Sequence, residues 1–339
     1  MSKKNSNVIL KNSFKEFDDL SKSYLNFRDK LDTFKKKSYV VAVSGGPDSL
    51  ALVALSKAYN FEKKTKFFYV LVNHNIRKNS TTEAKKVKNL LKKNKLNLII
   101  LTNKRKIMNN VQSNARKIRY KILTNFCRKK KITNLITAHN LEDQVETFLI
   151  RLSRGSGLKG LSSMKLRTNL DNKIWLYRPL LETKKETLKK ISKKIFGNYI
   201  RDPSNRNEKY LRTKIRALKK PLLKSGINYD QIIKSINNLA SSQIVLDKYF
   251  EKITKGKIKK TKNKVLINFN SFKNYEEEIQ IRVINNSIKF LKGNYYNSRS
   301  RKVINLIKSI SSKSFFKATL GGCIFYKQKD QILLKKEQK

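Results

Sequence analysis

Residues 39–55 read YVVAVSGGPDSLALVAL, and this stretch decides the fold. Its first five residues are apolar and mostly β-branched, which indicates a buried strand. A Gly-Gly-Pro turn follows, and then an apolar run at helical spacing. The sequence therefore predicts a strand, a tight loop and a helix in immediate succession.

The loop itself, SGGPDS, has the chemistry of a phosphate cradle. Gly45 and Gly46 allow close approach of a ligand to the backbone, and the following helix offers free N–H groups and a positive dipole end. Asp48 alone would repel phosphate, so we expect it to hold Mg2+. No lysine follows the glycines, so this is not the GxxxxGK[ST] loop. We expect the nucleotide to be bound by Ser44, Gly45, Gly46, Pro47, Asp48 and Ser49.

The same alternation of strand and helix continues along the first half of the chain. Further strands are predicted at 67–72, 98–101 and 135–138, with helices at 49–59, 82–93 and 111–130. This pattern predicts an α/β fold with a doubly wound, mainly parallel sheet. Ligands of such sheets bind at the carboxyl ends of the strands.

Three segments are expected along the chain. Residues 1–37 form a leading helical segment, with Phe14, Phe17, Leu20 and Tyr24 at helical spacing. Residues 38–222 form the nucleotide-binding domain. Residues 223–339 form a smaller α+β domain, with helices at 229–253, 276–291 and 298–310, a strand at 264–269, and short strands over 314–334 that turn at Gly321-Gly322.

The composition is strongly basic. Lys and Arg number 79 and Asp and Glu 24, which gives a net charge of +55. Folding such a chain costs self-repulsion, and a polyanion compensates it. Codon bias could explain why Lys is used in place of Arg. That exchange leaves the net charge unchanged, so it does not explain why Asp and Glu are so few. Nucleic acid is therefore the expected partner.

Cysteine and histidine usage excludes other classes. The two cysteines, Cys127 and Cys323, form no CxxC pair, and two histidines make a zinc enzyme improbable. The amino terminus has no apolar core of a signal peptide, and no run of 18 apolar residues predicts a membrane span. We expect a reduced, soluble, cytoplasmic protein.

Acidic residues gather just after the strand predicted at 135–138. Glu142, Asp143 and Glu146 begin a helix there, and Asp143 and Glu146 share one helix face. In a chain with few acids, this pair suits a cationic substrate. Compensation of the dipole of the helix amino terminus is the structural alternative.

Histidines and arginines also fall at the ligand edge. His74 and His139 follow predicted strands, although an isolated histidine is often structural. Arg116 and Arg119 lie on one helix and can contact a triphosphate or the target nucleotide, unless they form a solvated basic face.

Two further stretches are expected to reach nucleic acid. Gly155, Gly157 and Gly160 spell GxGxxG but follow a helix, so we expect Gly155 to end that helix and the loop to carry Arg151 and Arg154 toward RNA. A second polar, basic stretch joins the two domains. We expect it to contact the nucleic acid and partly close the site, with an ordinary linker as the alternative. Its residues are Arg201, Asp202, Pro203, Asn205, Arg212 and Arg216. Most aromatic residues of the tail are expected in its core, although they could stack on bases.

Several blocks together resemble one family. SGGPDS is similar to the PP-loop of the ATP pyrophosphatase superfamily. Over roughly residues 38–222, the order and spacing of further blocks resemble those of the tRNA(Ile)-lysidine synthases. These blocks are VNHNIR (72–77), ARKIRYKIL (115–123), TAHNLEDQVETFLIRLSRGSGLKGL (137–161), RPLL (178–181) and RDPSNRN (201–207). TLGGCIFY (319–326) resembles the family's carboxyl-terminal domain more weakly.

The resemblance implies an adenine nucleotide α-hydrolase-like fold and a two-step reaction. ATP, with Mg2+, adenylates the oxygen on carbon 2 of the wobble cytidine in an isoleucine tRNA with a CAU anticodon. The amine of free L-lysine then displaces AMP to give lysidine, which changes codon reading from AUG to AUA. A homodimer is possible.

Roles follow from this resemblance and from the residue chemistry together. We expect catalytic roles for Asp48, His139, Asp143, Glu146 and Arg116, and nucleotide binding by His74. The metal is assigned to Asp48 and Glu142, and the lysine amine to Asp143 and Glu146. Contacts with tRNA are assigned to Arg119, Arg151, Arg154, Arg201 and Arg212.

The chain departs from the family pattern at five positions. Asn73 stands where Asp is usual, Asn75 where Gly is usual, Ser113 where Glu is common, Asn140 where a second His is usual and Glu142 where Asp is usual. Glu142 keeps a carboxylate on a longer arm, whereas Asn73 and Ser113 lose the charge.

Three other functions were weighed. A tRNA thiolase on the same loop needs clustered cysteines, and a glutamine-dependent synthetase needs an ammonia-generating module with a nucleophilic cysteine. A non-catalytic RNA-binding protein gains nothing from acids in its cleft. Exchange of pyrophosphate into ATP separates an enzyme from a binder.

Overall fold

The computed structural model describes residues 18–77, 79–104, 107–108, 111–171, 173–200, 211–293 and 301–337. Its contacts divide the chain into two compact units. The first contains residues 1–152 and 163–236, and the second contains 153–162 and 237–339. The division falls inside one long helix, α11 (Tyr229–Thr254). The pattern of predicted elements had placed the domain boundary between residues 222 and 223.

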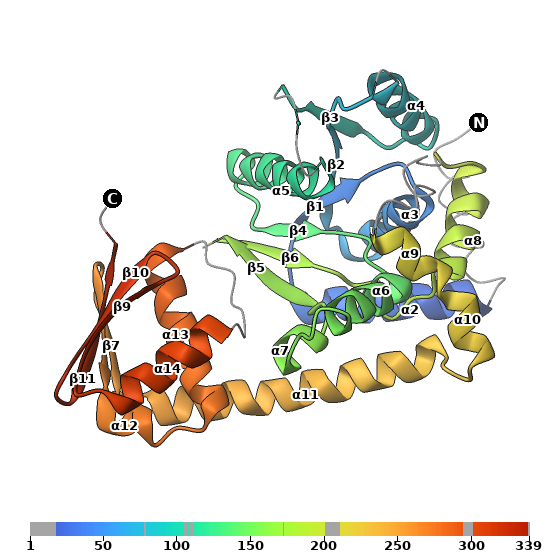
Figure 1. The fold of residues 1–339 in the computed structure, drawn as a ribbon. Helices are drawn as coiled ribbons and strands as arrows, with labels where there is room; N and C mark the ends of the chain where they lie inside the picture. The colour runs from blue at the N-terminus through green and yellow to red at the C-terminus, as the bar shows by residue number, and fades with distance from the viewer. Residues whose placement is uncertain are drawn as a thin grey trace. The chain divides into compact units, whose positions relative to one another are not determined.

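The first unit is built on a six-stranded sheet in the order β3-β2-β1-β4-β6-β5. All neighbours pair in parallel except β5 and β6, which form an antiparallel edge. The strands are β1 (Ser38–Val43), β2 (Lys66–Asn73), β3 (Leu98–Thr102), β4 (Asn134–Ile136), β5 (Arg167–Asp171) and β6 (Ile174–Tyr177). The doubly wound, mainly parallel sheet is therefore confirmed (Figure 1).

Helices of this unit connect and cover the strands. They are α2 (Asp18–Phe34), α3 (Pro47–Lys63), α4 (Ser80–Lys93), α5 (Val111–Lys129), α6 (Leu141–Leu152), α8 (Lys185–Phe196), α9 (Leu211–Ala217), α10 (Lys219–Lys224) and the start of α11. Phe14 and Phe17, expected in the leading helix, lie outside the described residues, whereas Leu20 and Tyr24 are buried in α2 as predicted.

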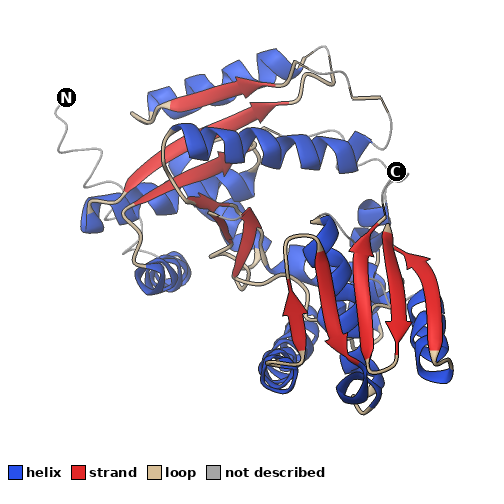
Figure 2. Ribbon diagram, turned by 90° about the vertical axis from the view of Figure 1, so that its left-hand side faces the viewer, coloured by secondary structure: helices blue, strands red, loops and turns tan. Residues whose placement is uncertain are grey.

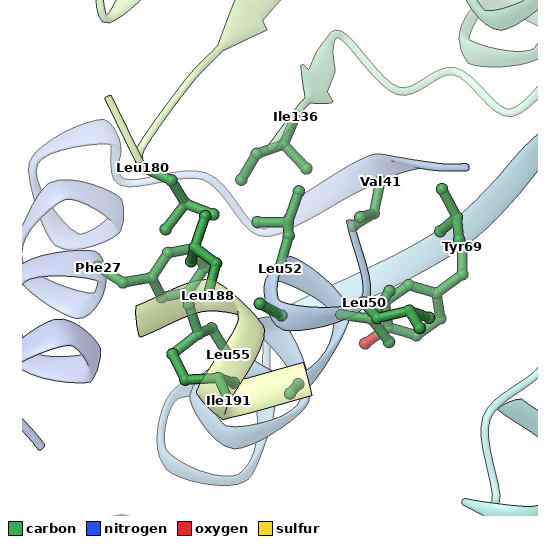
Figure 3. Packing of buried hydrophobic residues seen from close by; sticks show 14 of the residues in the cluster. Phe27, Val41, Leu50, Leu52, Leu55, Tyr69, Ile136, Leu180, Leu188 and Ile191 are labelled. Atoms are coloured by element: carbon green, nitrogen blue, oxygen red, sulfur yellow. The ribbon is translucent and has the colours of Figure 1, made fainter. Parts of the chain in front are cut away.

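Side chains alternate between two cores along the parallel strands. On β1, Val41 and Val43 face one core and Val40 faces the other, as period-two geometry requires. The first core packs β1 against α3 and α8, where Leu52 and Leu55 meet Leu188 and Ile191 (Figure 3). The second core is closed by α5. Burial on both faces explains why these strands read as continuous apolar runs.

The sheet has a topological switch point between β1 and β4. The chain winds from β1 through β2 to β3 on one side, and β4 then pairs with the other edge of β1. The loops that leave β1 and β4 diverge in opposite directions, which opens a crevice at their carboxyl ends. The SGGPDS loop follows β1 and the residues His139–Asn140 follow β4, so the fold brings both to this crevice.

The second unit is an α+β structure. An antiparallel sheet in the order β7-β8-β11-β10-β9 is covered on one face by α13 (Glu277–Lys292) and α14 (Arg301–Ser312), and Figure 2 shows these strands side by side. Its remaining elements are α7 (Leu158–Leu161), α12 (Phe269–Lys273), β7 (Ile258–Lys260), β8 (Lys264–Asn268), β9 (Phe315–Leu320), β10 (Cys323–Gln328) and β11 (Gln331–Lys336). Gly321 and Gly322 both have positive φ, as a two-residue hairpin turn demands.

The observed strands differ from the predicted ones at several places. The β5–β6 hairpin was missed, because Arg167–Asp171 carries few apolar residues, and β4 ends at Ile136 rather than at 138. The strand expected at 264–269 ends at Asn268, whose side chain accepts a hydrogen bond from Ser271 N and caps α12. In the described part of the chain, no helix is long and apolar enough to cross a membrane.

Candidate active site at the switch point

The SGGPDS loop is held together by the Ser49 hydroxyl. Ser49 Oγ accepts hydrogen bonds from the backbone N–H groups of Ser44 and Gly45, each at 3.1 Å, and donates to Gly46 O at 2.9 Å. Ser49 is 5% exposed. It therefore shapes the cradle from within, which is a more structural task than the phosphate contact predicted for it.

Gly45 is required by both conformation and space. Its φ is +84°, in the left-handed region that side chains rarely adopt. A Cβ atom there would lie 2.5 Å from Val87 Cγ2 of α4, and Gly45 O accepts a hydrogen bond from Ile200 N at 3.0 Å. Gly46 differs, because its φ of −76° suits any residue.

Asp48 lies in the first turn of α3 with one carboxylate oxygen buried. Among the described residues, Oδ1 has no hydrogen-bond partner. Burial, together with the nearby carboxylates of Asp143 and Glu142, raises the pKa of Asp48 to about 6, although Lys185 and Arg216 oppose the rise. A buried, unpartnered carboxylate beside other acids is costly to ionise unless a cation joins it.

This donor suits Mg2+. The ion prefers oxygen ligands and commonly takes one or two carboxylates, with substrate phosphates completing its shell. The unpartnered Oδ1 of Asp48 provides one such ligand. Within the described ranges, no group of three or more His, Cys, Asp or Glu side chains could hold a metal ion. Asp48 Oδ1 is the oxygen whose chemistry fits Mg2+.

The amino terminus of α6 carries a reciprocal capping box. Asn140 Oδ1 accepts from Asp143 N at 2.9 Å, and Asp143 Oδ2 accepts from Asn140 N at 3.2 Å. Asn140 is 1% exposed. This explains how asparagine serves at a position where the family usually has a second histidine, and it fixes Asp143 at the edge of the crevice.

Glu142 joins α6 to α8. Its Oε2 accepts from the backbone N–H of Lys185 at 2.8 Å, and its Oε1 lies 3.6 Å from Lys219 Nζ. Both oxygens of this buried carboxylate therefore already have partners. The observed contacts cap the start of α8, and the metal role of Glu142 stays a prediction.

Glu146 is enclosed by two guanidinium groups of α9. Arg212 Nε donates to Oε2 at 2.6 Å and Arg216 Nε donates to Oε1 at 2.6 Å. Arg212 Nη2 also reaches Asp143 Oδ1 at 3.0 Å. The Glu146 side chain is 3% exposed and that of Asp143 18%, so Asp143 is the more accessible of the two acids.

His139 lies in a strongly positive surrounding. Burial lowers its pKa well below the usual value, and Arg178, Arg116, Arg212 and Arg119 lower it further. Its Nδ1 is 2.8 Å from Thr137 Oγ1. The ring is therefore neutral, and the surrounding arginines favour an anion over a further positive charge.

The loop after β2 is stabilised by two asparagines. Asn73 Oδ1 accepts from Asn75 N at 3.0 Å, while Asn73 Nδ2 donates to Thr81 Oγ1 at 3.1 Å. Asn75 has φ of +52°, so it adopts the left-handed conformation that explains the glycine usual in the family. Asparagine is the next-best residue for this conformation.

His74 follows in the same loop and meets α5. Arg119 Nε donates to His74 Nε2 at 3.3 Å. Burial, together with Arg119, lowers the pKa of His74 to about 4. Arg116 lies 5.1 Å from the centre of the Tyr120 ring and is exposed. The charges of both arginines also lower the pKa of His139.

The other residues predicted to contact RNA lie in different surroundings. Arg151 Nη1 donates to Ser163 O at 2.9 Å, and Arg154 is exposed. Arg201, with Asp202, Pro203 and Asn205, lies outside the described residues. Ser113 is exposed on α5. The helix α6 ends at Leu152, three residues before Gly155, which was predicted to end it and which has a φ of +63°.

Two cations near the site, Arg178 and Lys185, were not predicted from the sequence. Arg178, 7% exposed, follows β6 and donates to Lys165 O at 2.8 Å and to Thr168 Oγ1 at 2.9 Å. Lys185 opens α8 and is the charge that acts most strongly on Asp48. The RPLL block could have drawn attention to Arg178, whereas Lys185 stands in a lysine-rich stretch that looks like ordinary surface.

Comparison with known proteins agrees with this geometry. A family model described as a PP-loop domain matches residues 17–222. The chain is similar to the tRNA(Ile)-lysidine synthase of Orientia tsutsugamushi (43% identity over 56% of this chain and 42% of that protein). It is also similar to the synthases of Wolbachia pipientis wMel (34% over 90% of this chain and 72% of that protein) and Rickettsia typhi (29%, 92% and 72%).

A solved structure supports the fold alone. The U34-tRNA thiolase NcsA from Methanococcus maripaludis superposes with a TM-score of 0.56 at 18% identity, over 66% of this chain and 80% of that one. At this identity the likeness concerns the arrangement of the sheet and its helices.

Proposed function

The chain belongs to the tRNA(Ile)-lysidine synthase family, and we propose that it joins free L-lysine to carbon 2 of the wobble cytidine in an isoleucine tRNA with a CAU anticodon. It uses ATP and gives lysidine, AMP and pyrophosphate. The observation that carries the proposal is the arrangement at the switch point, where Asp48 Oδ1, which has no hydrogen-bond partner among the described residues, lies close to the partly exposed Asp143 carboxylate.

In the first step, we infer that oxygen 2 of the cytidine bonds to the α-phosphorus of ATP while the bond to pyrophosphate breaks. The SGGPDS loop binds the phosphates, with its backbone opened by Gly45. Asp48 holds Mg2+, which supplies charge neutralisation at the phosphates when bound. His74, Arg116 and Arg119 border the nucleotide from the β2 loop and α5.

In the second step, the lysine amine bonds to carbon 2, the carbon–oxygen bond to the adenylate breaks, and AMP leaves. We infer that Asp143 receives the amine and that Glu146, directly behind it, adds negative potential. The attacking amine must lose a proton. Burial and the surrounding arginines lower the pKa of His139, so its ring stays neutral and is placed to orient the reacting groups by hydrogen bonding.

The cysteines support ligase rather than thiolase chemistry. Cys127 and Cys323 are both buried and belong to different units. Burial raises the pKa of the Cys127 thiol to about 12, so it stays protonated and unreactive. Sulfur delivery through these residues is disfavoured.

We place the enzyme in the cytoplasm, where tRNA is modified, and infer that the second unit and the basic residues around His139 contact tRNA. Arg119, Arg151, Arg154, Arg201 and Arg212 are the proposed contacts. Arg212 would have to leave its acidic partners, at least in part, to serve RNA. A homodimer is compatible with this function.

The test is incorporation of radiolabelled lysine into unfractionated tRNA, with and without ATP. We expect ATP-dependent label in an isoleucine tRNA only, with AMP formed rather than ADP. Label that is independent of ATP, or none at all with a folded chain, would contradict the proposal.

Two variants separate the two steps. Asp48→Ala is expected to abolish pyrophosphate exchange into ATP in the presence of tRNA, because the metal loses its ligand. Asp143→Ala is expected to retain exchange and lose lysine use. Retained exchange in Asp48→Ala contradicts the metal assignment, and an unchanged KM for lysine in Asp143→Ala contradicts the amine assignment.

A further inference from the structure

The proposed site is rich in acids and lacks a lysine in its phosphate loop. Asp48, Glu142, Asp143 and Glu146 border the same crevice, and the triphosphate of ATP adds further negative charge. A P-loop solves this with a lysine inside the loop, but SGGPDS has none. Cations from other elements must therefore reach the phosphates alongside Mg2+.

Lys185 is fixed beside the loop from two directions. Its backbone N–H is bound by Glu142 Oε2 at 2.8 Å, which attaches the start of α8 to α6. Leu188 and Ile191 pack against Leu52 and Leu55 of α3, the helix that the loop begins (Figure 3). After α8, the chain returns to the loop through the hydrogen bond from Ile200 N to Gly45 O.

Arg216 is fixed on the other side by Glu146. Nε and Nη2 donate to Glu146 Oε1 and Oε2 at 2.6 and 3.3 Å. Because Glu146 is almost fully buried and its second oxygen is held by Arg212, this guanidinium group has a defined position. Such pre-organisation lets a cation act without reorganising when charge develops.

Both cations lie on elements that border the proposed site. The start of α8, which carries Lys185, is bound by Glu142, and α8 packs on α3, the helix that carries Asp48. Arg216 is bound by Glu146 of α6. The side chains of Lys185 and Arg216 are partly exposed, which leaves them accessible to a ligand.

We propose that Lys185 and Arg216 bind the phosphate chain of ATP during adenylation, and so replace the lysine that a P-loop carries within its loop. This inference rests on the proposed function. As oxygen 2 of the cytidine bonds to the α-phosphorus, pyrophosphate leaves with the electron pair of the broken bond. The ammonium and the guanidinium groups stabilise the charge that develops on this leaving group.

The test uses four variants of the full chain. Lys185→Ala and Arg216→Ala remove the proposed cations. Lys189→Ala on α8 and Lys214→Ala on α9 remove exposed cations from the same helices and serve as matched controls. We expect tRNA-dependent pyrophosphate exchange to fall about 100-fold in each of the first two, and to change less than about two-fold in the controls. The KM for lysine stays near that of the parent chain.

Chemical rescue distinguishes phosphate binding from a structural role. Ethylamine is expected to restore exchange in Lys185→Ala, and guanidine at non-denaturing concentration in Arg216→Ala. Parent-level exchange in both variants, or a loss in folded variants that neither cation rescues, overturns the proposal.

A direct measurement of Mg-ATP binding tests phosphate binding by Lys185 and Arg216 separately from the proposed lysidine synthesis. We expect titration calorimetry to show about 10-fold weaker binding in Lys185→Ala and Arg216→Ala than in the controls. Weaker binding in a chain that forms no lysidine refutes the proposed function and supports this inference. Equal binding in all variants refutes this inference whatever the reaction.

Discussion

At the scale of single residues, the loop after β1 shows how a backbone position and a carboxylate divide one task. Gly45 provides the close approach, and Asp48 provides an oxygen, Oδ1, that has no hydrogen-bond partner in the part of the chain that the structure describes. Ser49 connects them by binding the N–H groups of Ser44 and Gly45. The loop is therefore shaped before any ligand binds, at the cost of an unfavourable buried acid.

Gly45→Ala is expected to lower the free energy of unfolding by about 2–4 kcal/mol, because the variant combines strain at positive φ with a clash against Val87. Gly46→Ala is the control. Its φ is extended and its nearest neighbour, Ser44 Oγ, is 3.7 Å from the added Cβ, so we expect a change within about 0.5 kcal/mol. Urea unfolding measures both, and equal losses would contradict the assignment.

His74 is expected to make stability depend on pH. Its pKa is lowered from 6.5 to about 4, so between these values the unfolded chain binds a proton that the folded chain does not. The free energy of unfolding therefore falls as pH falls through this window, by about 1–2 kcal/mol after allowance for partial exposure.

The measurement compares the parent chain with His74→Gln by urea unfolding at several pH values from 7 to 4.5. Other titrating groups are common to both chains and cancel in the difference. We expect the advantage of the parent chain to shrink toward acid pH. Parallel profiles would show that His74 has an ordinary pKa.

At the scale of elements, α6 organises the site because its first two turns carry three acids, Glu142, Asp143 and Glu146. Its amino terminus is closed by Asn140, Glu142 binds the start of α8, and Glu146 binds α9. One helix thus positions two others. The three acids that look equivalent in the sequence differ in role because each meets a different neighbour.

Asn140→Ala is expected to cost about 1–2 kcal/mol of stability, because the N–H of Asp143 loses its acceptor and the capping box opens. Asn140→Ser keeps an acceptor and should stay within about 0.5 kcal/mol of the parent chain. Urea unfolding compares the two. A loss of equal size in both variants would mean that packing of the larger side chain, rather than capping, is responsible.

Sequence reasoning reached the strands and the loop but not the contacts between elements. The runs 39–43, 67–72 and 98–101 were predictable because burial on both faces leaves an unbroken apolar signal. The β5–β6 edge has no such signal. The pairing of Glu146 with Arg212 and Arg216 joins residues about 70 positions apart, which no local pattern encodes.

At the scale of the whole molecule, charge decides the choice of partner. The net charge of +55 is spread over both units, and Glu142, Asp143 and Glu146 of α6 are acids with cationic partners at the proposed site. RNA is the polyanion that neutralises such a chain, and counterion release then supplies much of the binding free energy.

Binding of tRNA is therefore expected to depend steeply on salt. We expect the affinity to fall at least about 100-fold between roughly 50 and 200 mM salt, as for several phosphate contacts. Fluorescence anisotropy with a labelled tRNA, read at several salt concentrations, gives the slope. A change below about five-fold would mean that few phosphates are neutralised and that the charge serves another purpose.

The most direct test of the central claim is mass analysis of nucleosides from an isoleucine tRNA with a CAU anticodon, after reaction with ATP and isotopically labelled lysine. We expect the wobble cytidine alone to be converted, and its mass to rise by that of the labelled lysine less water. An unmodified cytidine, or a sulfur-containing nucleoside in its place, would contradict it.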